Sequence, residues 1–256
     1  MRTSLAIRSL GGLSAMVAAT AMTVPAQAQA PAYEEGAVSG GGSITGKVVF
    51  NGTPATRKVI PTKDVDVCGR PYEEALIEVG PDKSVQNTVV YLVDIAKGKA
   101  WPAQAKPPQI DNVKCKFDPR VQVVRVGKLD VVNSDPMLHN THGYYGKRTL
   151  FNLALPNQGQ RIPVDLPRPG AVRIDCDAHG WMEAWVYVLD NPYYAITGAD
   201  GKFSIPDVPA GAYKLVAAHP FTDPVEQSVT VAAGKPSDLN IELMNPQTSR
   251  QIGSGK

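Results

Sequence analysis

A thiol, an imidazole and a thioether follow one another at short intervals in the stretch from Ile174 to Met182. His179 comes after Cys176 with two residues between them, and Met182 follows after two more. A thiolate, an imidazole and a weakly bound thioether are donors that a copper ion accepts. No other stretch of the sequence concentrates so much ligand chemistry, and a fourth donor has to come from elsewhere in the chain.

The first residues have the features of a secretory signal peptide. A basic beginning is followed by an apolar core from Leu10 to Val24, and small residues at Ala28 or Ala30 fit a cleavage site. We expect residues 1–28 to be removed, and the protein to be periplasmic or secreted and to take up any metal outside the cytoplasm. A membrane anchor is the alternative, although the core is short for a span and is interrupted by Gly and Ser.

The balance of charges argues against a nucleic-acid partner. The sequence has 26 Lys and Arg against 24 Asp and Glu, and the predicted signal peptide removes two of the basic residues. Binding to phosphates depends on clustered Lys and Arg, and the sequence has no such cluster. No second apolar run is long enough to cross a bilayer, so we expect no membrane span after processing.

Short runs rich in Val, Ile, Tyr and Thr, punctuated by 22 Pro and 23 Gly, predict an all-β protein. Residues 29–42 end in a Gly-rich run and are expected to form a flexible leader. Residues 133–147, which contain two of the four histidines, are expected to be a long functional loop. The expected strands are 44–50, 75–79, 85–95, 113–117, 121–126, 129–132, 151–155, 162–166, 172–176, 184–190, 194–197, 203–205, 213–217, 228–231 and 239–243.

The pattern Cys176-x-x-His179-x-x-Met182 between two expected strands, preceded by His139-Asn140, resembles that of the cupredoxins, the blue copper proteins. The gap between His and Met is most similar to amicyanin, and the His-Asn pair is similar to that of plastocyanin and amicyanin. The resemblance implies a Greek-key β-sandwich, which we expect to occupy residues 43–190 in an extended form. It also implies one type 1 copper, with His139, Cys176 and His179 as the trigonal ligands, Met182 as the axial ligand, and Asn140 forming a hydrogen bond near the thiolate.

Some of these assignments have alternatives. Cys176 as a buried free thiol and Met182 as a core residue are the simpler interpretations when each is taken alone. The spacing of His179 and the upstream histidine together favour copper. His142, three residues after His139, can replace it as a ligand or take part in a Cys/His zinc site.

The ligand assignment has consequences for two other sets of residues. The sequence has three cysteines, so if Cys176 binds the metal, Cys68 and Cys115 remain to pair with each other. In an oxidising compartment we predict that these two form a disulfide. We further expect His179 to lie near the surface, where electrons enter or leave. The rim suited to brief docking of a partner is predicted to consist of Trp181, Pro136 and Met137.

A second resemblance covers the C-terminal part. The order T-x-x-D-G-K-F-x-I-P-x-V-P-A-G-x-Y-x-L, from Thr197 to Leu215, resembles the carboxypeptidase regulatory-like, transthyretin-type β-sandwich. This implies a small module without catalytic residues at 191–245, followed by a tail at 246–256. Because about 55 residues is short for an independent domain, we expect the module to pack on the copper domain through the strand at 184–190.

Enzymatic functions find little support in the sequence. It has no Gly-x-Ser-x-Gly elbow, no Gly-rich phosphate loop and no His-Glu-x-x-His, and four histidines are too few for a multicopper oxidase. We expect a monomeric one-electron carrier whose partner is a redox protein such as a c-type cytochrome or a dehydrogenase. The alternatives are a copper-delivery or copper-sensing protein, and a non-redox scaffold protein with a vestigial site.

Overall fold

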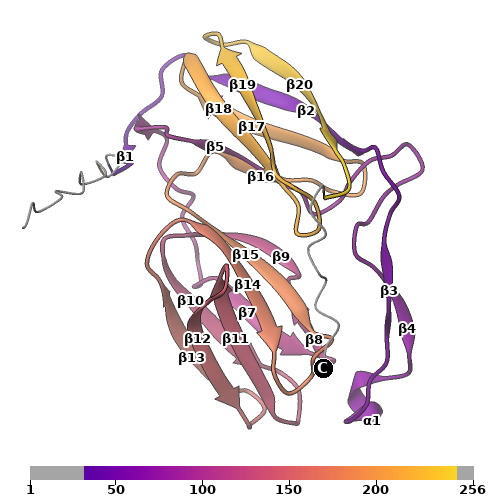
Figure 1. Ribbon diagram of the computed structural model, residues 1–256. Helices are drawn as coiled ribbons and strands as arrows, with labels where there is room; N and C mark the ends of the chain where they lie inside the picture. Colours follow the sequence, from indigo (N-terminus) through magenta and orange to yellow (C-terminus); the bar gives the residue numbers. More distant parts are fainter. Residues whose placement is uncertain (1–31, 247–256) are drawn as a thin grey trace, which may run out of the picture. The chain divides into compact units, whose positions relative to one another are not determined.

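The computed structural model describes residues 32–246. The predicted signal peptide and all but the first residue of the predicted tail lie outside the described residues. As predicted, the described chain is almost entirely β-structure, with one short helix (Figure 1). In this part of the chain, no helix combines the length and the apolar character needed to cross a membrane.

One β-sandwich, here called the inserted sandwich, is built from consecutive strands in the middle of the chain. The strands are β7 (Gln109–Val113), β8 (Lys116–Asp118), β9 (Val121–Arg125), β10 (Gly127–Asn133), β11 (His139–Tyr145), β12 (Arg148–Leu155), β13 (Arg161–Leu166), β14 (Gly170–Cys176) and β15 (Glu183–Leu189). One sheet has the order β13–β10–β7–β8 and the other β12–β11–β14–β15–β9. Strands β9 and β15 run parallel to each other, as do β7 and β10, so each of these pairs joins strands that do not follow one another in the chain.

The core of the inserted sandwich explains why these segments form strands. Their inward positions carry β-branched and aliphatic residues, including Val131, Leu155, Ile174 and Val186, which are all 0% exposed. Alternation of such residues with polar ones is the period of a strand with one buried face.

The segment expected to be a long loop, residues 133–147, contains strand β11. This strand pairs with β12 on one side and with β14 on the other, and Thr141 lies opposite Cys176. The expectation was wrong because β12 and β14 provide hydrogen bonds on both sides of this segment, which outweighs the low strand propensity of Asn140 and Gly143. Only residues 134–138 connect β10 to β11.

A second β-sandwich, here called the frame sandwich, takes strands from both ends of the described chain. They are β2 (Gly42–Phe50), β5 (Val89–Val93), β16 (Tyr194–Ile196), β17 (Lys202–Val208), β18 (Gly211–Ala218), β19 (Val225–Val231) and β20 (Pro236–Leu243). The sheets have the orders β16–β5–β18–β19 and β17–β2–β20. A separate two-stranded pairing joins β1 (Glu34–Glu35) to β6 (Lys97–Gly98).

This arrangement differs from the expected division into a copper domain at 43–190 and a module at 191–245. Strands β2 and β5 are central strands of the frame sandwich, where each pairs with C-terminal strands on both sides. Their apolar side chains complete its core, in which Ile44, Val48 and Leu92 are 0% exposed. Without them each sheet would be split, so the C-terminal strands do not form the sandwich alone.

Between β2 and β5 the chain forms a separate hairpin, here called the strap, residues 56–75. Strands β3 (Thr56–Val59) and β4 (Tyr72–Ala75) pair only with each other, and helix α1 (Val65–Cys68) lies at the tip of the hairpin (Figure 1). Of the hairpin expected from 75–79 and 85–95, a single bridge between Val79 and Val85 remains beside the predicted turn.

A small apolar cluster contains residues from both sandwiches, including Val89 and Val216 of the frame and Val121 and Tyr187 of the inserted sandwich. Tyr187 lies in β15, the strand through which contact was expected. His219 is 5% exposed and follows directly after β18.

Burial of His219 predicts a pH dependence of folding. Desolvation lowers its pKa to about 4 from an ordinary value of 6.5, and its Nδ1 accepts a hydrogen bond from the amide of Phe221 at 3.3 Å. Since the unfolded chain binds a proton more readily, stability should be lost as the pH falls from 6.5 to 4, by at most about 3 kcal/mol. Urea unfolding at several pH values should show a weaker acid loss for His219→Asn, which keeps an acceptor but does not titrate. An identical pH dependence for both proteins would contradict the prediction.

Gly46 tests whether β2 belongs to the frame sandwich. A Cβ at this position would overlap the backbone carbonyl oxygen of Leu239 in β20 and lie 2.9 Å from Cζ of Phe203 in β17. We expect Gly46→Ala to lower the free energy of unfolding by about 1–3 kcal/mol, as other overpacked sites do. Gly198→Ala is the matched control, because its Cβ would meet only Oδ1 of Asp200 at 3.7 Å. Equal stability of the two variants in urea would contradict the pairing.

Candidate metal centre

Three of the predicted ligands converge on one buried point of the inserted sandwich. Cys176 is the last residue of β14, His139 is the first of β11, and His179 lies in the turn between β14 and β15. The Sγ atom of Cys176 lies 3.7 Å from Nδ1 of His139 and 3.7 Å from Nδ1 of His179, and the two Nδ1 atoms are 3.1 Å apart. Both histidines are 0% exposed and Cys176 is 1% exposed. One sulfur and two nitrogens therefore face a common point that is shielded from water.

The far nitrogen of each imidazole is held by a carboxylate. Nε2 of His139 lies 2.9 Å from Oδ2 of Asp135, and Nε2 of His179 lies 2.8 Å from Oδ2 of Asp64. An ionised carboxylate only accepts hydrogen bonds, so each Nε2 carries the donated proton and each Nδ1 presents a lone pair to the centre. Two such lone pairs 3.1 Å apart repel each other unless a cation or a shared proton lies between them. The residues present therefore fit a cation held by both Nδ1 atoms and the thiolate.

Burial sets the protonation of these groups in the absence of a metal. Desolvation raises the pKa of Cys176, and backbone amides, including that of Asn140 at 3.4 Å from Sγ, oppose this rise. Desolvation also lowers the pKa of His139, which favours the neutral imidazole that a metal requires. A bound cation supplies the positive charge that a buried thiolate lacks, so metal binding and loss of the thiol proton are coupled.

Asp135 stabilises the connection between β10 and β11, which positions His139. It is 3% exposed, and its carboxylate accepts the amides of Lys114 at 2.6 Å and Cys115 at 2.9 Å in addition to the imidazole of His139. Its own amide donates to Oδ1 of Asn133 at 3.0 Å. One buried carboxylate thus joins the β7–β8 turn to residues 134–138, the connection that leads into His139.

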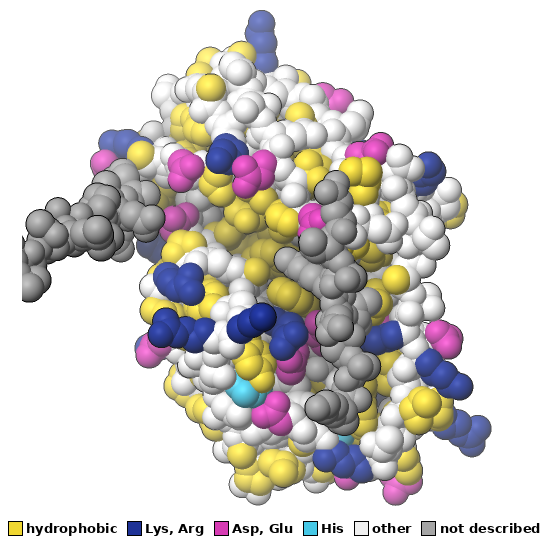
Figure 2. Space-filling model, in the orientation of Figure 1, with side chains coloured by type: hydrophobic (Ala, Val, Ile, Leu, Met, Phe, Trp, Pro, Cys, Tyr) yellow, Lys and Arg dark blue, Asp and Glu magenta, His cyan; other side chains and the backbone are white. Residues whose placement is uncertain are grey.

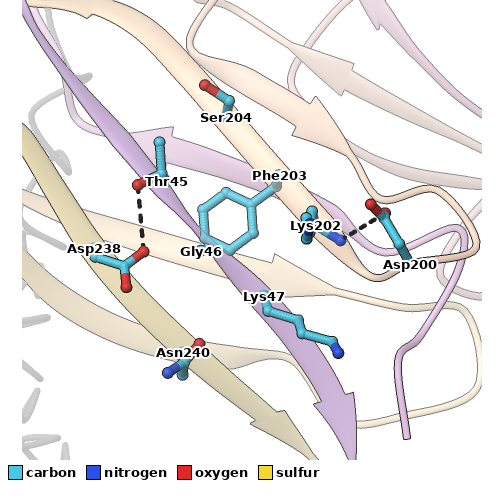
Figure 3. Close-up of a pocket in the computed structure, with 9 residues that line it drawn as sticks. All are labelled: Thr45, Gly46, Lys47, Asp200, Lys202, Phe203, Ser204, Asp238 and Asn240. Atoms are coloured by element: carbon cyan, nitrogen blue, oxygen red, sulfur yellow. Dashed lines mark hydrogen bonds between the residues drawn. The ribbon is translucent and has the colours of Figure 1, made fainter. Parts of the chain in front are cut away.

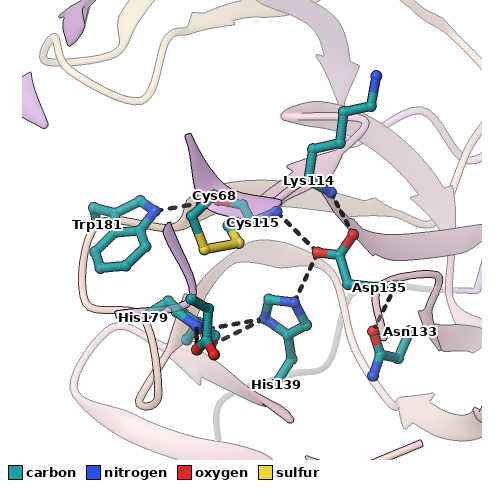
Figure 4. Close-up of a disulfide and its surroundings, with 10 residues drawn as sticks. Cys68, Lys114, Cys115, Asn133, Asp135, His139, His179 and Trp181 are labelled. Atoms are coloured by element: carbon teal, nitrogen blue, oxygen red, sulfur yellow. Dashed lines mark hydrogen bonds and ion pairs between the residues drawn. A yellow bond between two sulfur atoms is a disulfide. The ribbon is translucent and has the colours of Figure 1, made fainter. Parts of the chain in front are cut away.

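A disulfide lies against the donor set. Cys68 and Cys115 are bonded to each other, as predicted, and Cys176 is a free cysteine. Figure 4 shows the disulfide with Trp181 on one side and Asp135 on the other. The indole Nε1 of Trp181 donates to the carbonyl of Cys115 at 3.3 Å. The disulfide therefore attaches the tip of the strap to the wall of the site.

Met182 lies on the same short loop as two of the donors. Its amide donates to the carbonyl of His179 at 2.9 Å, and its side chain belongs to the same apolar cluster as Cys176, with 3% of the residue exposed. The axial bond to its sulfur stays a prediction.

His142 lies on the opposite face of β11 from His139. Residues three apart in a strand point to opposite faces. Nδ1 of His142 lies 3.0 Å from Oδ2 of Asp177, and its Nε2 lies 2.9 Å from Oγ1 of Thr149. The structure brings His139, and not His142, to Cys176.

Asn140 contacts the thiol through its backbone rather than its side chain. Its amide points to Sγ of Cys176, and its carbonyl accepts the amide of Asp177 at 3.1 Å. Its side-chain Oδ1 is buried and has no hydrogen-bond partner among the described residues.

The three residues predicted to form the docking rim differ in exposure. Pro136 is exposed, while Met137 and Trp181 are half-buried. The expectation that His179 lies near the surface was wrong, because the strap covers its outer edge and Asp64 binds its Nε2.

Sequence analysis missed both carboxylates. Asp135 lies four residues before His139, a local spacing that offered a signal. Asp64 lies 115 residues before His179, and no local pattern connects the two.

A groove elsewhere on the chain does not carry comparable chemistry. It has a volume of 590 Å³ and lies over the β17–β2–β20 sheet (Figure 3). Its polar side chains pair locally, as where Oγ1 of Thr45 donates to Asp238 at 3.3 Å. None of its lining residues is a Cys or a His.

Comparison with family models gives a match for the C-terminal part of the chain. Residues 181–244 match the family model of the carboxypeptidase regulatory-like domain. This match begins in the turn between β14 and β15 and does not include β2 or β5. Comparison with curated proteins finds no match.

Several solved structures are similar to part of the chain. Amicyanin from Paracoccus versutus has a TM-score of 0.31 and 19% identity, over 34% of this chain and 85% of that one. A purple cupredoxin from Nitrosopumilus maritimus has a TM-score of 0.29 and 24% identity, over 32% and 99%. A copper-containing nitrite reductase from Thermus scotoductus has a TM-score of 0.29 and 22% identity, over 37% of this chain but only 25% of that one. Scores this low carry no functional argument.

The role of Asp135 predicts a large cost for its removal. Asp135→Ala leaves the amides of Lys114 and Cys115 and the imidazole N–H of His139 without an acceptor, so we expect a loss of about 3 kcal/mol in the free energy of unfolding. Asp165→Ala is the control, because that carboxylate is 75% exposed and pairs only with Lys128 on the surface, which is worth at most about 1 kcal/mol. Urea unfolding of the metal-free proteins would refute the prediction if the two losses were equal.

Proposed function

We propose that this protein is an exported type 1 copper protein that carries one electron at a time between redox partners. The observation that carries the proposal is the convergence of two imidazole Nδ1 lone pairs and one thiol sulfur, each within 3.7 Å of the others, at a buried point. The proposed ligands are His139, His179, Cys176 and, at the axial position, Met182.

Copper supplies the one-electron chemistry in such a site, because thiolate and imidazole together bind both of its oxidation states. The protein holds these donors in place. Cys176 is fixed at the end of β14 by pairing with β11, and each imidazole is oriented by the carboxylate on its Nε2. Donors that do not move between oxidation states keep the reorganisation for each electron small.

Copper suits the donor set better than zinc. Structural zinc sites combine Cys and His in a closed tetrahedral set, and a thioether is a poor fourth donor for that ion. Met182 on the donor loop favours a softer metal. The two nearby carboxylates are engaged by imidazole N–H groups, so neither is free to serve as the fourth zinc ligand.

The proposed docking patch for a redox partner lies around Pro136 and Met137, beside His139. Leu138 between them and His139 is 47% exposed, which adds to the apolar surface. Trp181, the third member proposed, faces the disulfide. On the face drawn in Figure 2, acidic and basic side chains are both scattered among apolar ones, so an apolar patch with brief contacts suits a partner such as a c-type cytochrome or a dehydrogenase.

The compartment proposed is the periplasm or the exterior, where the signal peptide would be removed near Ala28 or Ala30. A disulfide is typical of such an oxidising compartment. Complete burial of the donors favours a carrier over a copper-delivery protein, because a delivery site must release its ion readily.

The spectrum of the copper-loaded protein tests the proposal. We expect addition of Cu(II) to the mature protein to give an intense thiolate-to-copper charge-transfer band and a type 1 paramagnetic resonance signal, both reversibly lost on reduction. Cys176→Ser should abolish the band, because it removes the sulfur that donates the charge. His139→Gln should lose it as well.

His142→Gln is the matched control and should keep the band, because that imidazole lies on the other face of β11. A colourless wild-type protein, or a spectrum unchanged by Cys176→Ser, would refute the blue-copper assignment. Ready transfer of copper to a chelator without a stable redox couple would indicate delivery, and tight binding of zinc alone would indicate a structural site.

A further inference from the structure

The strap reaches the metal centre at three points although it belongs to neither sandwich. Its tip is bonded to the inserted sandwich by the Cys68–Cys115 disulfide. Near its base, Nη2 of Arg57 donates to the carbonyl of Trp181 at 2.8 Å. Between these points, Asp64 binds Nε2 of His179 at 2.8 Å. The strap is thus fixed in place on both sides of the contact with the imidazole.

The backbone of Asp64 directs its carboxylate to His179. Asp64 has a left-handed conformation, with φ 51° and ψ 35°, which is uncommon for residues other than glycine. Its carbonyl accepts the amides of Val67 at 3.0 Å and Cys68 at 2.8 Å, so the turn of α1 begins there. Its side chain makes no capping hydrogen bond to that turn. The carboxylate is used for His179 rather than for the helix.

We propose, on the basis of the function proposed above, that Asp64 is a positioning residue that directs Nδ1 of His179 at the copper and lowers the reduction potential of the site. A carboxylate that accepts the distal N–H fixes the tautomer and orientation of a ligand imidazole and makes it more basic. A more basic donor, with a negative charge behind it, stabilises the ion with the higher positive charge more strongly. The oxidised site therefore gains more than the reduced one.

Asp64 is a better probe of this effect than Asp135. Asp135 also accepts two backbone amides, so its removal disturbs the fold. The side chain of Asp64 is 38% exposed while that of His179 is 0% exposed. The carboxylate therefore contacts both solvent and a buried proposed ligand. Partial exposure weakens its electrostatic effect, which places the expected change at the lower end of the range for residues that support metal ligands.

The test compares two neutralised carboxylates on the same helical turn. Asp64→Asn keeps the size of the side chain and an acceptor oxygen but removes the charge. We expect it to weaken binding of Cu(II) relative to Cu(I) about tenfold, which corresponds to a reduction potential about 59 mV more positive. Asp66→Asn is the matched control. Asp66 is exposed in the first turn of α1, and this substitution removes the same charge two residues away from Asp64. It should leave the potential unchanged.

Two further variants separate positioning from a general charge effect. Asp64→Ala should shift the potential in the same direction and also alter the paramagnetic resonance signal, because the imidazole loses its orienting acceptor. Cys68→Ser combined with Cys115→Ser frees the tip of the strap, so neutralising Asp64 in that background should have a smaller effect than in the wild type.

Equal shifts for Asp64→Asn and Asp66→Asn, or no shift for either, would overturn the inference while leaving a wild-type copper band intact. A shift of full size in the variant without the disulfide would overturn the part assigned to the strap. Absence of the band from the wild type would instead refute the proposed function, so the two failures are distinguishable. Circular dichroism of each variant, with disulfide mapping of those that retain Cys68 and Cys115, verifies that the fold is intact.

Discussion

The architecture around the proposed site depends on one constraint, the mutual repulsion of three electron-rich atoms held together away from water. Two imidazole nitrogens and a sulfur face each other at 3.1–3.7 Å, and the carboxylates behind the imidazoles leave the lone pairs no other orientation. Because the three donors do not attract each other, strand pairing and core packing must hold them together. The β11–β14 ladder provides this, because it places Thr141 opposite Cys176 and so fixes the separation of His139 from the thiol. The cation that would relieve the repulsion also makes the thiolate stable at a depth where the free thiol keeps its proton.

Strand β11 shows which features of the site can be predicted from the sequence and which cannot, because residues an odd number apart in a strand point to opposite faces. The donor types and spacings on the Cys176 loop, with an upstream histidine, predicted that Cys176, His179 and that upstream histidine would lie together, and the structure brings them together. Choosing between His139 and His142 needed the knowledge that their segment is a strand, since alternate faces then separate them. The segment was expected to be a loop, whereas pairing with β12 and β14 makes it a strand despite the low strand propensity of Asn140 and Gly143.

Nonlocal pairing also explains why strands were predicted better than their partners. Alternation in the run from Ile44 to Phe50 predicts strand β2, and the structure has that strand. Nothing within the run indicates that its neighbours are β17 and β20, more than 150 residues away. The contact between Asp64 and His179 could not be predicted for the same reason, because the two residues are far apart in the sequence and only the fold brings them together. The disulfide was predictable for a different reason, because three cysteines with one assigned to the metal leave a single pair.

The order of strands along the chain connects the frame sandwich to the proposed metal centre. The inserted sandwich occupies the chain between β5 and β16, and the strap occupies it between β2 and β5, so the frame sandwich is closed only when both of its own ends have paired around these segments. The strap has no sheet of its own beyond one hairpin, and its base continues on both sides towards central strands of the frame. Its tip is covalently tied to Cys115 beside the donors. The frame sandwich therefore anchors, through β2 and β5, the segment that supplies Asp64 and one half of the disulfide. Loss of β2 or β5 pairing would loosen the base of the strap without altering any proposed ligand, and the disulfide and Arg57 would then be the remaining attachments of the segment that contains Asp64.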